Sequence, residues 1–354
     1  MVMIAVATRS LVFLALALIY HSIAVLAFDI TRNDNLAVYW GQDSAGNQKQ
    51  LSTYCADATI DNVILAFLYI FNGTGGEPVI DFANICNQYD DSVFPGTALA
   101  NCSFMASQIE ACQAKGKIVT LSLGGGTGQV GLSSTTVAQN FANKIWNEFL
   151  GGSSTTRPFG SAVLDGVDLD IESGSPNHYS AFVNRIRSHA SGASKKYYVT
   201  AAPQCPFPDA NIGAALNAAS FDAVFVQFYN NYCGLDQPDD YNFNTWDDWA
   251  RSGSANPDIK VYIGAAASAN AAGEGYVDIG TLENYATNGQ DTFDSFGGVM
   301  LWDASEAYTN HRYDKAIKNA MTANAARSKV EERKSKGHLE STYPAEKPFL
   351  HVQL

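Results

Sequence analysis

The sequence predicts a single (β/α)₈ barrel, and three observations lead to this fold class. Eight short runs of apolar and β-branched residues are bounded by Gly, Pro, Asn or Asp, and most are separated by segments with helical spacing. The runs are apolar throughout, which is typical of parallel strands covered on both faces. The chain of 354 residues has no central linker, so one barrel is favoured over the competing doubly wound open sheet.

The first 27 residues have the pattern of a secretory signal peptide. They contain one basic residue, Arg9, then an apolar run and a small residue at Ala27. A membrane anchor is the alternative, but polar residues interrupt the run at positions 20–22 and no second apolar span follows. We therefore expect residues 1–27 to be removed on export, an extracellular or cell-wall location, and no stable membrane anchor.

The barrel is expected over residues 28–321. Its strands are predicted in order at 36–42, 62–71, 117–125, 166–172, 197–205, 223–230, 261–268 and 297–305. Helical spacing is clearest at 102–116, 135–151 and 175–191. Residues 322–354 are charged and lack periodic apolar positions, so they are predicted to be a disordered tail.

Charge and cysteine content restrict the partners and the compartment. The formal net charge is −13, which argues against nucleic acid or anionic lipid as a general partner and favours a neutral or cationic ligand. Six cysteines, an even number in a chain expected to be exported, favour disulfides over zinc ligation, and the residues alone allow 15 pairings. The sequons at Asn72 and Asn101 agree with secretion and are candidate glycosylation sites.

The fourth predicted strand contains a row of acids in the stretch LDGVDLDIE, residues 164–172. Side chains alternate along a strand, so Asp168, Asp170 and Glu172 face one side, and in a barrel they point inward with Glu172 nearest the catalytic C-terminal mouth. Like charges this close cannot all ionise in a poorly solvated site, so one carboxyl is expected to keep a proton for general acid catalysis. A calcium or magnesium site is the alternative, but the three acids span more than one barrel layer without a facing acidic cluster. We expect no metal and no cofactor.

A second motif, GTGQVG at 126–131, satisfies the pattern GxGxxG after a predicted strand, and Glu148 lies near the position of a ribose-binding acid. The motif follows the third strand rather than the first, in a chain with 29 glycines. Dinucleotide binding is therefore not favoured.

The acid row and several other motifs resemble glycoside hydrolase family 18. Its strand-four pattern DxxDxDxE is matched by Asp165, Asp168, Asp170 and Glu172, and VYWGQ, LAFL, SLGG, QFYNN and LWD follow in family order on successive predicted strand ends. The sequence is most similar to the plant and fungal class III chitinases of the hevamine type, from about Leu36 to Ala320. The chain departs from the plant pattern in a longer stretch between Cys86 and Cys102 and in its charged tail, which leaves the length of the cleft open.

The resemblance implies roles for individual residues. Glu172 is the general acid and base, Asp170 holds the acetamide N–H of the substrate, and Asp168 shares a proton with Asp170, while Asp165 shapes the entry of the strand. Tyr229 donates a hydrogen bond to the acetamide oxygen. The remaining expected substrate-binding positions are Tyr39, Gln42, Phe67, Gly124, Gly125, Gln227 and Trp302.

The resemblance also implies covalent features of the barrel. The expected disulfides are Cys55 with Cys112, Cys86 with Cys102, and Cys205 with Cys233. Non-proline cis peptides are expected at Ala66-Phe67 and Trp302-Asp303.

The implied activity is that of a secreted, monomeric endo-chitinase acting on chitin and N-acetylglucosamine oligomers. The acetamide of the substrate attacks the anomeric carbon, so β-1,4 links are cut with retention of configuration. An endo-β-N-acetylglucosaminidase acting on glycoprotein glycans is the rival enzyme. A non-catalytic chitin-binding lectin or inhibitor on the same barrel is the rival from another class, but such proteins typically lack the acid.

Overall fold

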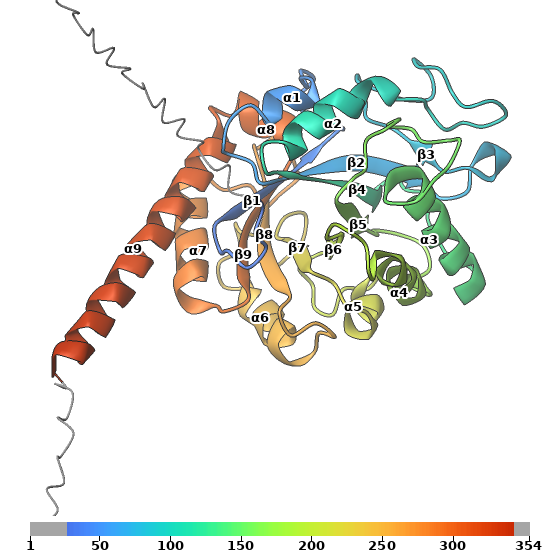
Figure 1. Cartoon of the computed structure of the whole chain (residues 1–354). Coiled ribbons are helices and arrows are strands. Elements are labelled where there is room, and N and C mark those ends of the chain that lie inside the picture. Colours follow the sequence, from blue (N-terminus) through green and yellow to red (C-terminus); the bar gives the residue numbers. More distant parts are fainter. Residues whose placement is uncertain (1–26, 343–354) are drawn as a thin grey trace, which may run out of the picture.

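The computed structural model of the protein describes residues 27–342 (Figure 1), so the predicted signal peptide up to residue 26 lies outside the described residues. Eight parallel strands close into a barrel in the order β1-β9-β8-β7-β6-β5-β4-β2, and β1 pairs with β2 to complete the ring. The predicted (β/α)₈ barrel is confirmed.

Each of the eight predicted segments contains one barrel strand. These are β1 (Asn35–Trp40), β2 (Asn62–Ile70), β4 (Ile118–Gly124), β5 (Gly166–Asp170), β6 (Tyr198–Ala201), β7 (Ala223–Gln227), β8 (Lys260–Ala266) and β9 (Phe296–Trp302). One further strand, β3 (Val79–Ile80), pairs antiparallel with the end of β2 and was not predicted, because two residues are too few to show a period.

The helices surround the barrel (Figure 1), and the three segments with the clearest helical spacing contain α2, α3 and α4. Ser134 begins α3 because its side-chain oxygen accepts a hydrogen bond from the Val137 N–H at 3.2 Å. The helical elements are α1 (Leu51–Tyr54), η1 (Thr74–Gly76), η2 (Ser103–Met105), α2 (Ala106–Gln113), α3 (Thr135–Phe149), α4 (Tyr179–Ala190), α5 (Gly213–Ala218), α6 (Phe243–Ser252), α7 (Ile279–Thr292), α8 (Ala304–Thr309) and α9 (Tyr313–Thr342).

Buried apolar residues form two clusters separated by the strands. The larger cluster lies between strands and helices and includes the outward residues of β5, Val167 and Leu169. The smaller cluster fills the barrel interior and includes Tyr39, Tyr262 and Met300. The acid row of β5 therefore enters an interior that is otherwise largely apolar, which is the condition that shifts carboxyl pKa values.

The prediction of a disordered tail from residue 322 is wrong for residues 322–342, which continue α9. Figure 1 shows this half of the helix projecting beyond the barrel. The N-terminal half is anchored, since Tyr313, Ile317 and Met321 recur every four residues and are buried. Alanine, lysine, arginine and glutamate have high helix propensity, so a helix nucleated by packing continues without its own apolar stripe.

No helix within residues 27–342 is both long enough and apolar enough to cross a membrane.

Candidate active site

The acids of β5 lie on one side of the strand, as their spacing predicts. Asp168 is fully buried and Asp170 is 3% exposed, while Val167 and Leu169 face the surrounding helices. Glu172 lies two residues beyond the end of the strand and is partly exposed. The row therefore runs from the closed interior of the barrel to its accessible C-terminal mouth.

Asp168 is held by hydroxyl groups from three other strands, the adjacent β4 and β6 and the more distant β1. Tyr39 and Ser122 each donate a hydrogen bond of 2.7 Å to Oδ2, and Thr200 donates one of 2.7 Å to Oδ1. The strand register explains the contacts, because Ser122 and Thr200 pair directly with Asp168 from either side. Ser122 and Thr200 were missed in the sequence, although their inward positions on the adjacent strands were available as a signal, whereas Tyr39 was expected at the site as a substrate-binding residue.

Asp170 is oriented by an amide rather than by Asp168. Gln227 Nε2 donates to Asp170 Oδ1 at 2.9 Å and to the carbonyl oxygen of Ala202 at 2.9 Å. That Asp168 and Asp170 share a proton stays a prediction. Asp168 is already satisfied by three hydroxyl donors, and Asp170 interacts with Glu172.

The Asp170 and Glu172 carboxyls both have raised pKa values. Burial raises the pKa of Asp170 well above its ordinary value, and the nearby charges of Glu172 and then Asp168 raise it further. Burial also raises the pKa of Glu172, while hydrogen bonds from Asp170 and Gln227 act in the opposite direction. The pair therefore retains a proton at a pH where two isolated carboxyls would both be ionised.

Asp209 is a further acid near this pair that the sequence did not single out. Its negative charge raises the pKa of both Asp170 and Glu172. It is fixed by backbone donors, with Gln204 N at 2.9 Å from Oδ2 and Ile212 N at 2.7 Å from Oδ1. A carboxylate that caps a loop in this way gives no motif in the sequence.

Two tyrosines face the acids as neutral groups. Burial, followed by the charges of nearby carboxylates, raises the pKa of both Tyr39 and Tyr229 well above the ordinary value. The Tyr39 hydroxyl donates its hydrogen bond to Asp168. The Tyr229 hydroxyl makes no hydrogen bond to any residue in the described part of the chain. Tyr229 therefore has a hydroxyl proton available for a ligand.

Aromatic rings form the floor beside the acids. The rings of Phe67 and Trp302 are stacked with centroids 5.9 Å apart, and Tyr39 meets Trp302 edge-on at 5.5 Å. Trp302 is partly exposed at the end of β9. The expected cis peptides at Ala66-Phe67 and Trp302-Asp303 are both present.

The two glycines that end and follow β4 allow close packing against the site. Gly124 has φ of 121°, and a Cβ there would lie 2.1 Å from the carbonyl oxygen of Asp170. Gly125 has φ of 83°, and its Cβ would lie 2.8 Å from the Phe67 ring. Only glycine fits both positions, because the backbone conformation and the space each exclude a side chain.

Gln42 lies at the same end of the barrel, but its side-chain amide is used by the protein itself. Nε2 donates to the carbonyl oxygens of Ala66 at 2.9 Å and of Gly41 and Asp81 at 3.2 Å. These bonds connect the loop after β1 to the end of β2. The side-chain oxygen remains as the group with which Gln42 can contact a ligand.

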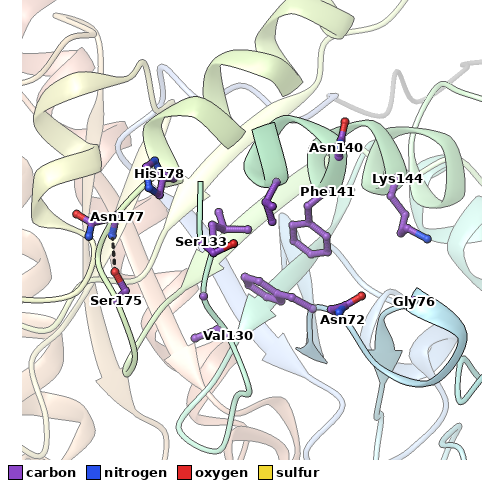
Figure 2. A pocket seen from close by; sticks show the side chains of 14 residues that line it. Asn72, Gly76, Val130, Ser133, Asn140, Phe141, Lys144, Ser175, Asn177 and His178 are labelled. Carbon is purple, nitrogen blue, oxygen red and sulfur yellow. Dashed lines mark hydrogen bonds between the residues drawn. The ribbon is translucent and has the colours of Figure 1, made fainter. Parts of the chain in front are cut away.

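A pocket of about 670 Å³ lies against α3 (Figure 2). It lies between α3 and the loops that follow β2, β4 and β5, and it has an apolar floor that includes Phe71 and Phe141. None of the three acids lines it, so this pocket is separate from the catalytic candidates. Asn72, one of the two candidate glycosylation sites, lies at its edge.

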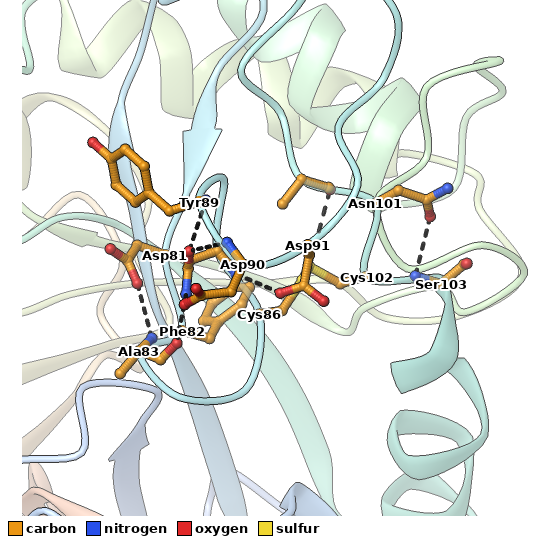
Figure 3. The surroundings of a disulfide bond; sticks show 12 residues. Asp81, Phe82, Ala83, Cys86, Tyr89, Asp90, Asp91, Asn101, Cys102 and Ser103 are labelled. Atoms are coloured by element: carbon orange, nitrogen blue, oxygen red, sulfur yellow. Dashed lines mark hydrogen bonds between the residues drawn. A yellow bond between two sulfur atoms is a disulfide. The ribbon is translucent and has the colours of Figure 1, made fainter.

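The three disulfides join the pairs that the family resemblance implied. They are Cys55–Cys112, Cys86–Cys102 and Cys205–Cys233. Figure 3 shows the surroundings of the second one, which closes the loop between Cys86 and Cys102. Among the described residues, no group of three His, Cys, Asp or Glu side chains is arranged to hold a metal ion.

The fold and the site together define a class of protein. A proton-retaining carboxyl pair at the C-terminal mouth of a (β/α)₈ barrel, beside a free phenolic hydroxyl and an aromatic platform, is suited to acid-catalysed cleavage of a glycosidic bond. Such an arrangement is typical of glycoside hydrolases. The chain belongs to the glycosyl hydrolases family 18, whose model matches residues 35–324.

Comparison with known proteins agrees with the family. "Chitinase 2" of Rhizopus oligosporus is 44% identical over 313 residues, covering 88% of this chain and 56% of that protein. The chain spans little more than half the length of the first curated relatives that it matches.

Solved structures with the same barrel include both an enzyme and an inhibitor. The chitinase of Ipomoea carnea has a TM-score of 0.69 and 33% identity, over 81% of this chain and 99% of that one. The xylanase and alpha-amylase inhibitor protein XAIP-II of Scadoxus multiflorus has a TM-score of 0.68 and 34% identity, over 80% and 97%. Only the site, therefore, can separate catalysis from inhibition.

Proposed function

We propose that this protein is a secreted endo-chitinase that hydrolyses β-1,4 links between N-acetylglucosamine units with retention of configuration. The observation that carries the proposal is the Asp170–Glu172 pair, whose raised pKa values favour a retained proton beside Tyr229, a residue whose hydroxyl has no hydrogen-bond partner among residues 27–342. Chitin is uncharged, so it suits a protein with a net charge of −13.

The proposed reaction begins with a sugar ring over Trp302. Glu172, at the accessible end of the row, donates its proton to the glycosidic oxygen, while the substrate's acetamide oxygen attacks the anomeric carbon. The Tyr229 hydroxyl donates a hydrogen bond to that acetamide oxygen and so aligns it for attack. With the proton of the pair on Glu172, Asp170 is ionised, so it accepts a hydrogen bond from the acetamide N–H and stabilises the positive charge that develops on the resulting ring.

The second half of the reaction returns the enzyme to its starting state. Glu172, now ionised, removes a proton from a water molecule that attacks the anomeric carbon and opens the intermediate. Each of the two displacements inverts the configuration of the anomeric carbon, so the product keeps the β configuration of the substrate. Asp168 acts indirectly: three hydroxyl donors hold it in place, and its charge adds to the burial and the Glu172 charge that raise the pKa of Asp170, which helps the pair to hold one proton.

The decisive experiment compares wild type with Glu172→Gln on N-acetylglucosamine oligomers, with anomer analysis of the products. Glutamine keeps the shape of the side chain but cannot donate a carboxyl proton, so turnover is expected to fall by about 10²- to 10⁴-fold while oligomer binding persists. Turnover equal to wild type would remove Glu172 from this role. Fully deacetylated chitosan is the matched substrate control, and rapid cleavage of it would reject attack by the acetamide.

An inhibitor or lectin function is supported by the likeness to XAIP-II. The retained Glu172, Asp170 and Tyr229 favour catalysis. Release of reducing ends from colloidal chitin, beside deglycosylation of a high-mannose glycoprotein, separates the chitinase from both the non-catalytic protein and the rival endo-β-N-acetylglucosaminidase.

Export and glycosylation belong to the same proposal. Asn72 is exposed in the loop after β2 and is open to modification. Asn101 is half-buried, its side-chain oxygen accepts a hydrogen bond from Ser103 N at 3.2 Å, and Cys102 between them is in a disulfide. We expect the secreted monomer to carry its glycan mainly at Asn72.

A further inference from the structure

A bulge near the end of β2 turns two consecutive side chains toward the inside of the barrel. The register of β2 with β4 shifts between Leu65 and Leu68, and the extra residue there makes the consecutive Ala66 and Phe67 both join the interior cluster. Alternation then resumes, so Leu68 faces the helices and Tyr69 faces inward. Tyr69 is therefore the next inward residue above Phe67, at the mouth of the barrel.

Tyr69 extends the aromatic floor of the site toward β3. It packs on the interior cluster that contains Phe67, whose ring stacks on Trp302. Its hydroxyl accepts a hydrogen bond of 2.9 Å from Gln88 Nε2. That bond joins the mouth of the barrel to the loop between Cys86 and Cys102, the stretch in which this chain exceeds the plant pattern.

The residue after Gln88 presents a bare aromatic ring. Tyr89 is 80% exposed, the highest value of any large hydrophobic side chain that the structure describes. It directly follows Gln88, whose side chain donates the 2.9 Å hydrogen bond to the Tyr69 hydroxyl, so Tyr89 lies where the loop meets the mouth of the barrel. Figure 3 shows the Tyr89 ring projecting from the loop on the same side as Asp81, which is itself near Tyr69.

The turn that carries Tyr89 is rigid. Asn87 is 7% exposed, and its side-chain oxygen accepts hydrogen bonds from Tyr89 N at 2.8 Å and Asp90 N at 3.0 Å. Its amide nitrogen donates to the carbonyl oxygen of Ala83 at 3.0 Å and to Asp90 Oδ2 at 2.8 Å. The disulfide Cys86–Cys102 closes the base of the loop. An exposed ring that is already fixed in place loses little entropy when it binds a ligand.

We propose that Tyr69 and Tyr89 form an additional sugar-binding subsite, which extends the cleft from Trp302 along the end of β2 and gives the enzyme a preference for long chitin chains. The ring of Tyr89 supplies an apolar face for one sugar unit, and the phenol of Tyr69 supplies a polar edge beside it. This inference rests on the proposed chitinase function and deepens it, because it assigns chain-length selection to the elongated disulfide loop.

The test measures kcat and KM on oligomers of three and of six N-acetylglucosamine units for wild type, Tyr89→Ala and Tyr89→Phe. A single aromatic contact contributes about 0.5–1.5 kcal/mol, so Tyr89→Ala is expected to raise KM for the hexamer by about 2- to 12-fold. The trimer, which is too short to reach the loop from the reacting position, is expected to show unchanged KM. Tyr89→Phe keeps the ring and is expected to behave as wild type.

Phe104→Ala is the matched control, because Phe104 is 49% exposed and lies just beyond Cys102. An unchanged hexamer-to-trimer ratio in Tyr89→Ala, or an equal loss in Phe104→Ala, overturns the inference. If wild type cleaves neither oligomer, the proposed function fails, and the subsite is then judged by oligomer binding followed through tryptophan fluorescence. Weaker binding of the hexamer alone in Tyr89→Ala supports the subsite, and equal binding by wild type and variant rejects it.

Discussion

Asp168 and Asp170 stand two residues apart on the same face of β5, yet their surroundings give them different chemistry. Three hydroxyl donors stabilise the charged form of Asp168 and partly offset its burial. Asp170 has one amide donor, and it lies beside both Asp168 and the carboxyl of Glu172. Like charges in a closed space cannot all ionise, so the proton is retained at the end of the row where the substrate is expected.

The raised pKa of Glu172 leads to a prediction about pH. The acid must be protonated to cleave the substrate, so activity persists below its pKa and is lost as pH rises through it. We expect the alkaline limb of the kcat/KM profile to lie clearly above 4.5, the ordinary glutamate value, and to report the Asp170–Glu172 pair as a unit. A limb near 4.5, in a protein shown by circular dichroism to stay folded over that range, would contradict this assignment.

At the scale of elements, a second buried carboxyl connects α3 to the loop that carries η1. Glu148 is 4% exposed, and its Oε2 has no hydrogen-bond donor among the described residues. The carboxyl of Glu77, which also accepts a hydrogen bond from Lys144 at 2.7 Å, lies against it. When Glu148 is protonated, its carboxyl can donate a hydrogen bond to the Glu77 carboxylate. This agrees with the pKa of Glu148, which burial and then Glu77 raise to about 8.

This contact predicts how stability depends on pH. Because the folded pKa of Glu148 is raised, its stabilising contribution is complete below 4.5 and is lost as pH rises toward about 8. Glu148→Gln removes the titrating group, so its Tm is expected to fall less than that of wild type between pH 5 and about pH 8.5. Each kcal/mol recovered in the alkaline range corresponds to about 2–4 °C.

Thermal melts at closely spaced pH values measure the effect. Glu110→Gln is the matched control, because Glu110 is an exposed residue on α2 whose substitution leaves the buried contact intact. Parallel Tm curves for wild type and Glu148→Gln across the range would mean that Glu148 does not hold the proton.

At the scale of the whole molecule, α9 divides into a structural half and a projecting half. Lys318 Nζ donates to the carbonyl oxygen of Asp34 at 2.6 Å and to Asp61 Oδ2 at 2.7 Å. These two residues directly precede β1 and β2, so the bonds attach the helix to the N-terminal end of the barrel. Asn324 is the last buried side chain that the structure describes in this helix. Beyond it the helix contributes length but little packing.

Truncation tests this division. A chain ending at Ser328 keeps every buried contact described for α9, so its Tm is expected to stay within about 2 °C of wild type. A chain ending at Arg312 loses Ile317 and Met321 from the core, where each buried side chain contributes about 1.5–3 kcal/mol, and is expected to unfold at a much lower temperature. Equal Tm values for the two truncations would show that α9 does not stabilise the barrel.

Much of the site was predictable because it depends on local periodicity. The alternation around Asp168, Asp170 and Glu172 requires only that the segment be a strand, and the apolar runs show where the strands lie. The partners of those acids were less accessible. Ser122 and Thr200 become recognisable only when the register of β4, β5 and β6 is known, and Asp209 only when its loop folds back toward the mouth.

The sequence by itself determined the barrel, the inward row of acids and, through its motifs, the family, because these follow from patterns repeated within single segments. Tertiary structure decided that Asp170 and Glu172 are the pair whose pKa values are coupled, since that depends on burial and on donors brought together from four strands. It also decided that Tyr69 meets the loop that carries Tyr89, because a bulge in β2 turns Tyr69 inward and Gln88 of the disulfide-closed loop donates a hydrogen bond to its hydroxyl. The periodicity of a strand specifies which way each side chain points, but only the closed barrel specifies which donors and charges surround it.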